Sequence, residues 1–169
     1  MNTVIQAANM TPGDNTLPHP LLTADAIAQM PEQVFVHPLN PRAIRQTKSL
    51  GDVVGFHHIG VHWVRVAPGH NSTEQHVHQL EEEFIYVLSG RGEADIGEET
   101  FTVGPGDFLG FAAKGVAHSL RNPYDEDLVY LVGGMRLEYD ICDYPRLGKR
   151  MYRAGENRDY VDLEDSGSK

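Results

Sequence analysis

The apolar positions of this chain fall into short runs separated by glycine and proline, from about residue 51 onward. Runs of about four to eight residues bounded by turn formers are typical of β-strands. The pattern predicts eight strands, over residues 60–67, 74–79, 83–89, 92–96, 100–103, 107–111, 118–122 and 128–133. Pairs such as Pro68-Gly69 and Asn122-Pro123 supply reversals, because these residues preset or tolerate turn conformations. The expected fold class is all-β, as a sandwich or a barrel.

The segment before these strands has a different composition. Six of the ten prolines lie in the first 41 residues, which predicts an N-terminal arm over residues 1–48. One short helix is expected in this arm, over residues 23–33, with Thr23 as its N-cap and Ala26, Ile27 and Met30 on one side. The barrel is expected over residues 49–136. A C-terminal extension, residues 137–169, should pack on the barrel, mostly at the surface, with residues 160–163 as an edge strand.

Two of the predicted strands are apolar at every position, namely residues 84–88 and 128–132. A strand with one solvated face alternates apolar and polar side chains, so both faces of these strands should be covered. The arm and a second copy of the chain are the two candidates for the outer cover. The sequence predicts both, and the second implies a homodimer.

Length and charge limit the class of protein. With 169 residues, the chain is long enough for one packed core and too short for two ordinary domains. A formal net charge of −10 would repel phosphate backbones, which argues against a general nucleic-acid partner. The longest apolar runs have five residues, far below the roughly 18 of a membrane span, so no membrane partner is expected. No secretory signal is visible and Cys142 is the only cysteine, which favours a cytoplasmic location.

Four side chains have the spacing of a metal site. His76 and His78 are two residues apart, so on a strand both imidazoles point to the same side. Glu83 begins the next predicted strand, where a hairpin would return its carboxylate beside them, and a barrel could close His118 onto the same point. Three imidazoles and one carboxylate suit Fe, Mn, Ni or Zn. We expect one divalent metal ion per chain, in an open site, because structural zinc sites usually contain sulfur ligands.

These residues also resemble the two signature motifs of the cupin superfamily. The motif positions are Gly69, His76, His78, Glu83 and Gly90 for the first, and Gly106, Asp107, Gly115, His118 and Asn122 for the second. Longer stretches, including EEEFIYVLSG and VGPGDFLGF, are similar to a group of small bacterial single-domain cupins. Two departures fall in turns: one extra residue precedes His76, and residues 112–115 lack the usual proline. The resemblance implies a jelly-roll β-barrel, a metal on His76, His78, Glu83 and His118, and dimers, but no particular substrate.

The strand before the first motif allows two arrangements. His62 would reach the barrel interior if Val64 and Val66 face inward. Trp63 and Arg65 form the alternative inward set. The sequence leaves both arrangements open.

Other side chains near the motifs have less specific signals. Glu81 and Glu82 are expected to be solvated turn charges, and Cys142 is expected to pack as a small apolar side chain. Candidates for orienting a substrate are Tyr86, Tyr130, Arg121 and Arg136. No residue is assigned a catalytic role at this stage.

Two classes of function fit these residues. The first is a small-molecule enzyme that uses the bound metal as a dioxygenase, isomerase or lyase would. The alternative is a cupin that binds or senses a small molecule without converting it, since one fold hosts many functions. An ionisable side chain near an open metal position would favour the enzyme.

Overall fold

The computed structural model of the protein describes residues 18–163. Its strands are β1 (Gln33–His37), β2 (Asn40–Ser49), β3 (Ile59–Val66), β4 (Val77–His78), β5 (Glu83–Ser89), β6 (Gly92–Ile96), β7 (Glu99–Val103), β8 (Phe108–Phe111), β9 (His118–Arg121), β10 (Leu128–Met135), β11 (Tyr139–Tyr144), β12 (Lys149–Ala154) and β13 (Asn157–Asp162). The helical segments are α1 (Ala24–Gln29), α2 (Leu50–Val53) and the 3-10 turn η1 (Pro145–Leu147).

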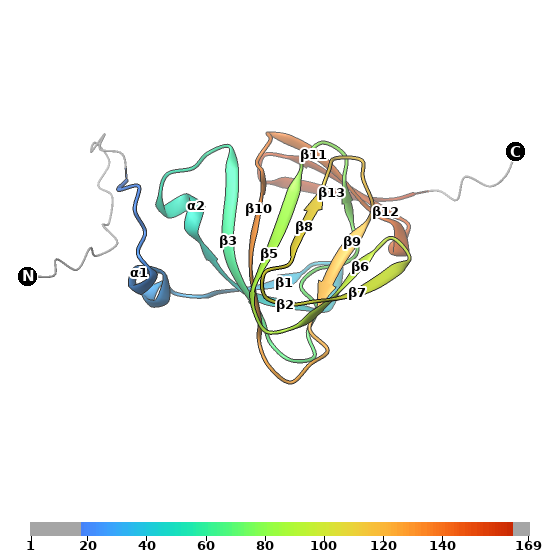
Figure 1. The fold of residues 1–169 in the computed structure, drawn as a ribbon. Helices are drawn as coiled ribbons and strands as arrows, with labels where there is room; N and C mark the ends of the chain where they lie inside the picture. The colour runs from blue at the N-terminus through green and yellow to red at the C-terminus, as the bar shows by residue number, and fades with distance from the viewer. Residues whose placement is uncertain (1–17, 164–169) are drawn as a thin grey trace, which may run out of the picture.

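The strands form antiparallel sheets around a common interior (Figure 1). One sheet has the order β1-β2-β3-β10-β5-β8, a second has the order β13-β12-β11-β4, and a third has the order β7-β6-β9. Strands distant in sequence, such as β3 and β10, therefore lie side by side, as the long connections of a jelly roll require. The expected all-β jelly-roll architecture is confirmed.

The six-stranded sheet begins earlier in the chain than the proline pattern suggests. β1 and β2 lie in the segment expected to be an arm, yet they pair with each other, and β2 pairs with β3. Pro41 stands near the start of β2, and the β1–β2 pairing shifts register between Val36 and His37. Strand starts and bulges are the positions where a sheet tolerates proline. The prolines here mark a hairpin at the edge of the sheet.

Helix α1 is shorter than the helix that the sequence predicts. It begins as expected, because the Thr23 hydroxyl accepts a hydrogen bond from the backbone N–H of Ala26 at 3.2 Å. It ends at Gln29, because Pro31 disfavours helical geometry at Met30, whose backbone is extended. Within residues 18–163, neither helix is long and apolar enough to cross a membrane.

Cross-strand pairing decides which side chains face the interior. Val64 is fully buried and lies opposite Tyr130, which in turn lies opposite Val87. His62 lies on the same face of β3 as Val64 and Val66, whereas Trp63 and Arg65 lie on the outer face. The inward set is therefore His62, Val64 and Val66. The buried core consists of Val64, Val66, Ile85, Val87, Ala94, Val103, Leu109, Leu120, Leu128 and Tyr130.

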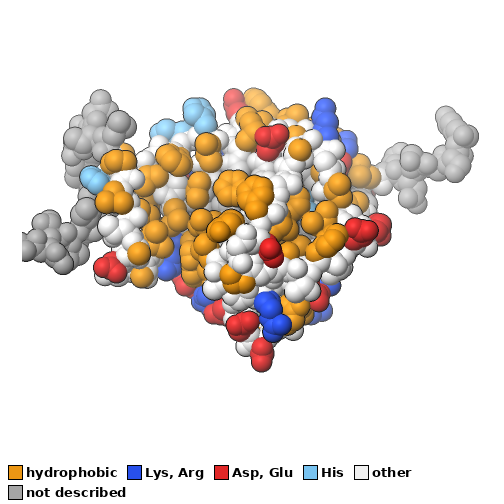
Figure 2. Space-filling model, in the orientation of Figure 1, with side chains coloured by type: hydrophobic (Ala, Val, Ile, Leu, Met, Phe, Trp, Pro, Cys, Tyr) orange, Lys and Arg blue, Asp and Glu red, His pale blue; other side chains and the backbone are white. Residues whose placement is uncertain are grey.

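The outer face of the six-stranded sheet is covered only in part. Lys48 connects it to α1, because its Nζ donates to the carbonyls of Ile27 and Ala28 and lies over the Trp63 ring. Farther along this face, Figure 2 shows hydrophobic side chains gathered over β10, β5 and β8. The exposed side chains of this outer patch are Tyr86, Leu88 and Phe108, which are 41%, 39% and 66% exposed.

The C-terminal extension forms β11, β12 and β13. β13 is the edge strand expected near residues 160–163. The expectation that this segment lies mostly at the surface is wrong for β11, which pairs with β4 and places Cys142 opposite His78. Cys142, Tyr144 and Met151 form a second buried cluster. The tail therefore contributes core, because the short strand β4 has an open edge that β11 completes.

Gly90 and Gly69 offer a matched test of turn packing. Both have positive φ angles, +74° and +78°, but a Cβ on Gly90 would lie 2.1 Å from the Asp127 carbonyl oxygen, whereas one on Gly69 would contact nothing within 4 Å. We predict that Gly69→Ala lowers the free energy of unfolding by about 1–2 kcal/mol through backbone strain alone. Gly90→Ala should cost about 1–3 kcal/mol more through the clash. Urea denaturation of both variants checks this, and equal losses would contradict it.

Candidate metal centre

The fold brings the four predicted ligand side chains together inside the barrel. His76 pairs with His118 in an antiparallel bridge, with backbone N···O distances of 3.0 and 2.8 Å. His78 follows on β4, and the chain then turns so that Glu83 begins β5. Residues directly opposite each other in a sheet share a face, so His76 and His118 project to the same side.

The side chains are close together but are not directly hydrogen-bonded to one another. The Nε2 atom of His78 lies 3.8 Å from one carboxylate oxygen of Glu83, and the Nε2 atom of His118 lies 3.7 Å from the other. The ring centroid of His76 is 4.9 Å from that of His78 and 4.6 Å from that of His118. N–H···O hydrogen bonds span about 2.7–3.2 Å. With metal–ligand bonds of about 2.1 Å, two ligands of one ion lie roughly 3–3.5 Å apart, which is nearer the observed spacing.

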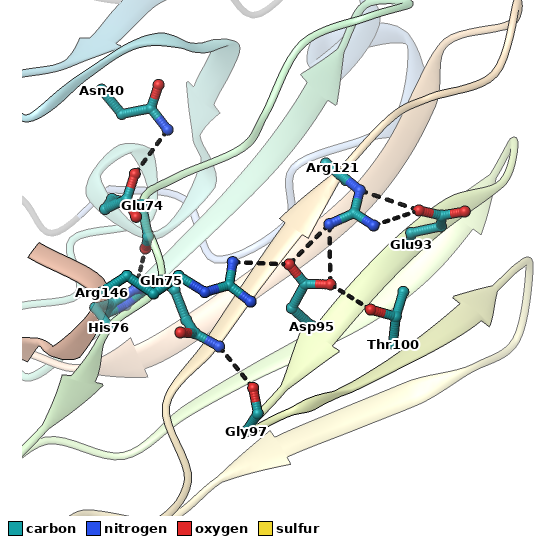
Figure 3. A network of polar contacts seen from close by, with 10 residues as sticks. All are labelled: Asn40, Glu74, Gln75, His76, Glu93, Asp95, Gly97, Thr100, Arg121 and Arg146. Atoms are coloured by element: carbon teal, nitrogen blue, oxygen red, sulfur yellow. Dashed lines mark hydrogen bonds and ion pairs between the residues drawn. The ribbon is translucent and has the colours of Figure 1, made fainter.

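The other nitrogen of each imidazole has an oxygen partner. Nδ1 of His76 lies 2.9 Å from the Glu74 carbonyl (Figure 3), and Nδ1 of His118 lies 3.3 Å from the Val116 carbonyl. Nδ1 of His78 lies 2.6 Å from Oδ2 of Asp140. With a proton on each Nδ1, each Nε2 keeps a free lone pair that is available to a cation.

One buried nitrogen supports the fit of these residues to a metal ion. Nε2 of His118 is buried and has no hydrogen-bond partner among residues 18–163. Such an orphaned group is costly unless something else satisfies it. His76, Glu83 and His118 each offer a ligand atom within 4.8 Å of the others. The residues therefore fit a divalent cation, which would satisfy the lone pair of His118 and the charge of Glu83 together.

The protonation states of Glu83 and His76 also suit metal ligands. Burial alone would raise the pKa of Glu83, but the neighbouring imidazoles, His118 first, reverse this effect and lower the pKa to about 2. Burial lowers the pKa of His76 to about 3. For His78, burial acts in the same direction, but Asp140 outweighs it and raises the pKa. At neutral pH the site thus holds an ionised carboxylate and a neutral His76, as metal binding requires.

Asp140 contacts the candidate site, and no signal in the sequence pointed to it. Its side chain is fully buried, and its other oxygen accepts a hydrogen bond from the backbone N–H of Leu80 at 3.2 Å. The hydrogen bond to His78 fixes the orientation of that ring, as carboxylates commonly do for metal-bound histidines. Asp140 lies 62 residues after His78 and outside both motifs, so no local spacing marked it.

Glu81 and Asp140 also form a group of ligand type with His78. Glu81, however, is already paired with Arg153 at 2.5 Å, and its side chain is only 12% exposed. The expectation that Glu81 is a solvated turn charge is therefore wrong. The pairing makes this group a hydrogen-bonded support rather than a second cation site.

Cys142 lies close to His76 and His78. Burial raises the pKa of its thiol to about 12, so the sulfur stays protonated at neutral pH. Cysteine binds metals as the thiolate. A protonated Cys142 therefore agrees with the packed role that the sequence predicts.

A pocket of about 470 Å³ reaches Glu83, the one candidate ligand among its described lining residues. Its lining residues are Ile59, Glu82, Glu83, Phe84, Phe108, Gly110, Phe111, Ala112, Gly134 and Met135. The Phe111 ring stacks on His118 with centroids 3.4 Å apart, so the wall of the pocket adjoins the ligand cluster. The volume falls within the range of about 300–1,000 Å³ that is typical of small-molecule sites.

The structure separates the candidates for substrate orientation. Tyr86 faces outward, and the hydroxyl of Tyr130 is engaged with that of Ser72 at 2.5 Å in the core. Arg121 is held by Glu93 and Asp95 in a network that also includes Arg146 (Figure 3). Arg136 lies next to the pocket-lining Met135. It is the candidate whose position is compatible with substrate contact.

Comparison with known proteins agrees with this architecture. Residues 62–134 match the family model described as the cupin domain. No protein with a curated description matches the chain.

Solved structures extend the similarity over most of the chain. A protein from Acidithiobacillus ferrooxidans, described as a candidate sugar phosphate isomerase, is 46% identical with a TM-score of 0.84, and the match covers 88% of this chain and 96% of that one. A sugar phosphate isomerase of the cupin superfamily from Silicibacter pomeroyi is 26% identical with a TM-score of 0.75, over 89% and 97% of the two chains. A predicted oxalate decarboxylase from Thermotoga maritima shares the fold, at 20% identity and a TM-score of 0.56, over 66% and 96%. The chain belongs to the cupin superfamily.

Proposed function

We propose that this protein is a metal-dependent isomerase of a phosphorylated sugar. The observation that carries the proposal is the 46% identity, over nearly the whole of both chains, to the Acidithiobacillus ferrooxidans protein described as a candidate sugar phosphate isomerase. The convergence of three imidazoles and a carboxylate beside a pocket of about 470 Å³ supports it. His76, His78, Glu83 and His118 hold one divalent ion of Fe, Mn, Ni or Zn in this proposal.

A divalent metal held by these four residues would supply Lewis-acid polarisation of a substrate carbonyl or hydroxyl. The apolar walls of the pocket, including Phe84 and Phe111, exclude water from the reacting carbons. Glu82 also lines the pocket and stands outside the ligand set, so its carboxylate is our candidate for moving a proton on the substrate. Gly134 leaves the approach to Glu83 free of a side chain.

The first experiment measures metal content and turnover together. We predict one transition metal per chain in protein purified without a tag or chelator, and its loss in His76→Ala. With aldose and ketose phosphates in D₂O, proton NMR should show interconversion that falls by about 10²–10⁴-fold in Glu82→Gln. Glu98→Gln, which removes the same charge in the β6–β7 turn, is the control.

Metal and ligand binding without turnover would replace the isomerase with the alternative, a binding or sensing cupin. Protein that stays folded yet refuses Mn, Fe, Ni and Zn would contradict the metal centre itself.

Asp140 should tune the affinity of this centre. We predict that Asp140→Asn weakens binding of Zn²⁺ or Mn²⁺ about 10–100-fold, because the ring of His78 loses its charged partner. Asp143→Asn is the matched control, since Asp143 lies on the same strand but pairs with Arg150. Competition with a chromophoric chelator measures both affinities. Equal affinities in the two variants would show that Asp140 is not a support of the metal site.

We propose that the protein forms a homodimer through the outer patch of the six-stranded sheet. Tyr86, Leu88 and Phe108 expose large apolar side chains on neighbouring strands that α1 does not reach. Contiguous apolar surface of this kind is unusual on a monomer and is typical of an interface.

The oligomeric state can be tested with two matched phenylalanine variants. Phe108→Glu should shift the mass measured by light scattering from twice the chain mass to 18.8 kDa, because a charge would be buried in the interface. Phe101→Glu, which alters a 45% exposed phenylalanine on β7 of another sheet, should leave the dimer intact. A monomeric mass for the parent protein would contradict the dimer proposal.

The cellular setting follows from the thiol and the proposed substrate. Cys142 is buried and free. A chain whose single cysteine forms no disulfide is compatible with a reducing compartment. We therefore propose a cytoplasmic protein whose partner is a small molecule.

A further inference from the structure

A polar cluster separate from the four candidate ligands lies where β3 begins and β10 ends. Nη1 of Arg136 donates to Oδ1 of Asp52 at 2.5 Å, and the hydroxyl of Ser49 donates to the other carboxylate oxygen at 2.5 Å. Nη2 of Arg136 lies 3.5 Å from Nε2 of His62. Asp52 therefore holds one end of the guanidinium, while its Nε–Nη2 edge faces the His62 side.

This guanidinium lies over the interior face of the sheet. A Cβ placed on Gly60 would lie 3.0 Å from Nε of Arg136 and 3.5 Å from Nε2 of His62. The arginine side chain thus occupies space that any larger residue at position 60 would take. His62 belongs to the inward set and is paired with Ser49 on β2. The guanidinium consequently lies on the inward side of β3, while Asp52, whose side chain is 53% exposed, lies at the surface.

Two glycines connect this cluster with the candidate metal centre. Gly60, Gly134 and Glu83 are directly opposed on β3, β10 and β5. Adjacent strands are about 4.8 Å apart, so the backbone of Gly60 lies about 10 Å from that of Glu83. Neither glycine projects a side chain into the space between. Gly134 and Glu83 both line the pocket, so the pocket begins one strand away from Gly60.

The two ends of the row formed by Gly60, Gly134 and Glu83 differ in charge. The described residues that line the pocket include two glutamates and no lysine or arginine. Arg136 therefore brings positive charge to the far end, with two N–H groups in the fork that matches phosphate oxygens. The protein as a whole carries a net charge of −10, so a phosphorylated substrate needs such a local partner.

We propose that Arg136, oriented by Asp52 and flanked by His62 and Ser49, binds the phosphate group of the substrate while the sugar carbons reach the four candidate ligands. The identity of the substrate as a sugar phosphate rests on the proposed function. The anion site itself rests on the geometry of Arg136 and Gly60. Substrate would bind along the sheet, across Gly134, with its anionic end at Arg136 and farthest from Glu83.

Inorganic phosphate is the probe for the anion site, used with the metal-free full-length chain at low ionic strength. Phosphorus NMR titration should show saturable binding that weakens about tenfold or more in Arg136→Gln. Arg91→Gln is the control, because it removes the same charge from a side chain that is 57% exposed. His62→Gln should also weaken binding, and it leaves the Arg136–Asp52 pair in place if Arg136→Gln unfolds. Equal affinity in Arg136→Gln and the parent, or no binding by the folded parent, would overturn the site.

Turnover separates this proposal from the proposed function. If the isomerase assignment holds, Arg136→Gln should raise KM for the phosphorylated sugar more than KM for the unphosphorylated sugar. An isomerase whose KM ignores Arg136→Gln would retain the function and overturn the anion site. Phosphate binding that depends on Arg136, in a protein without isomerase turnover, would retain the anion site and overturn the function.

Discussion

The structure depends on keeping an ionised carboxylate inside an apolar barrel. Glu83 stands at the start of β5, among strands whose buried core side chains are mostly valine, leucine and isoleucine. An isolated buried charge is costly, and here three imidazoles around it offset the penalty and keep the group ionised. The Nε2 atoms of His78 and His118 lie 3.8 and 3.7 Å from the carboxylate oxygens, too far for hydrogen bonds. The spacing therefore suits a cation between these groups better than a structural hydrogen-bond network.

The supports of the site come from both ends of the chain. Asn40 on β2 donates to the Glu74 side chain at 2.8 Å, and the Glu74 carbonyl in turn faces Nδ1 of His76 (Figure 3). At the other end, Asp140 on β11 holds His78. The β1–β2 hairpin and the C-terminal strands therefore hold two ligands in place as well as adding core.

Most of the barrel and all four candidate ligands could be predicted from sequence, because their signals are local. The i, i+2 histidines and the hairpin to Glu83 follow from strand alternation, and glycine turns mark the strand ends. Three features had no such signal. The prolines around β1 and β2 resemble those of a loop, and only pairing across the sheet identifies a hairpin. Asp140 is distant in sequence from His78, and the parity of His62 depends on which face of β3 is buried.

The range of the cupin match leaves out two residues that support the candidate site. Residues 62–134 contain all four candidate ligands but exclude both Asn40 and Asp140. The unit that sequence similarity identifies is thus smaller than the unit that holds the candidate site in place. Substitutions on β2 or β11 would change how the rings of His76 and His78 are held, although neither strand contributes one of the four candidate ligands.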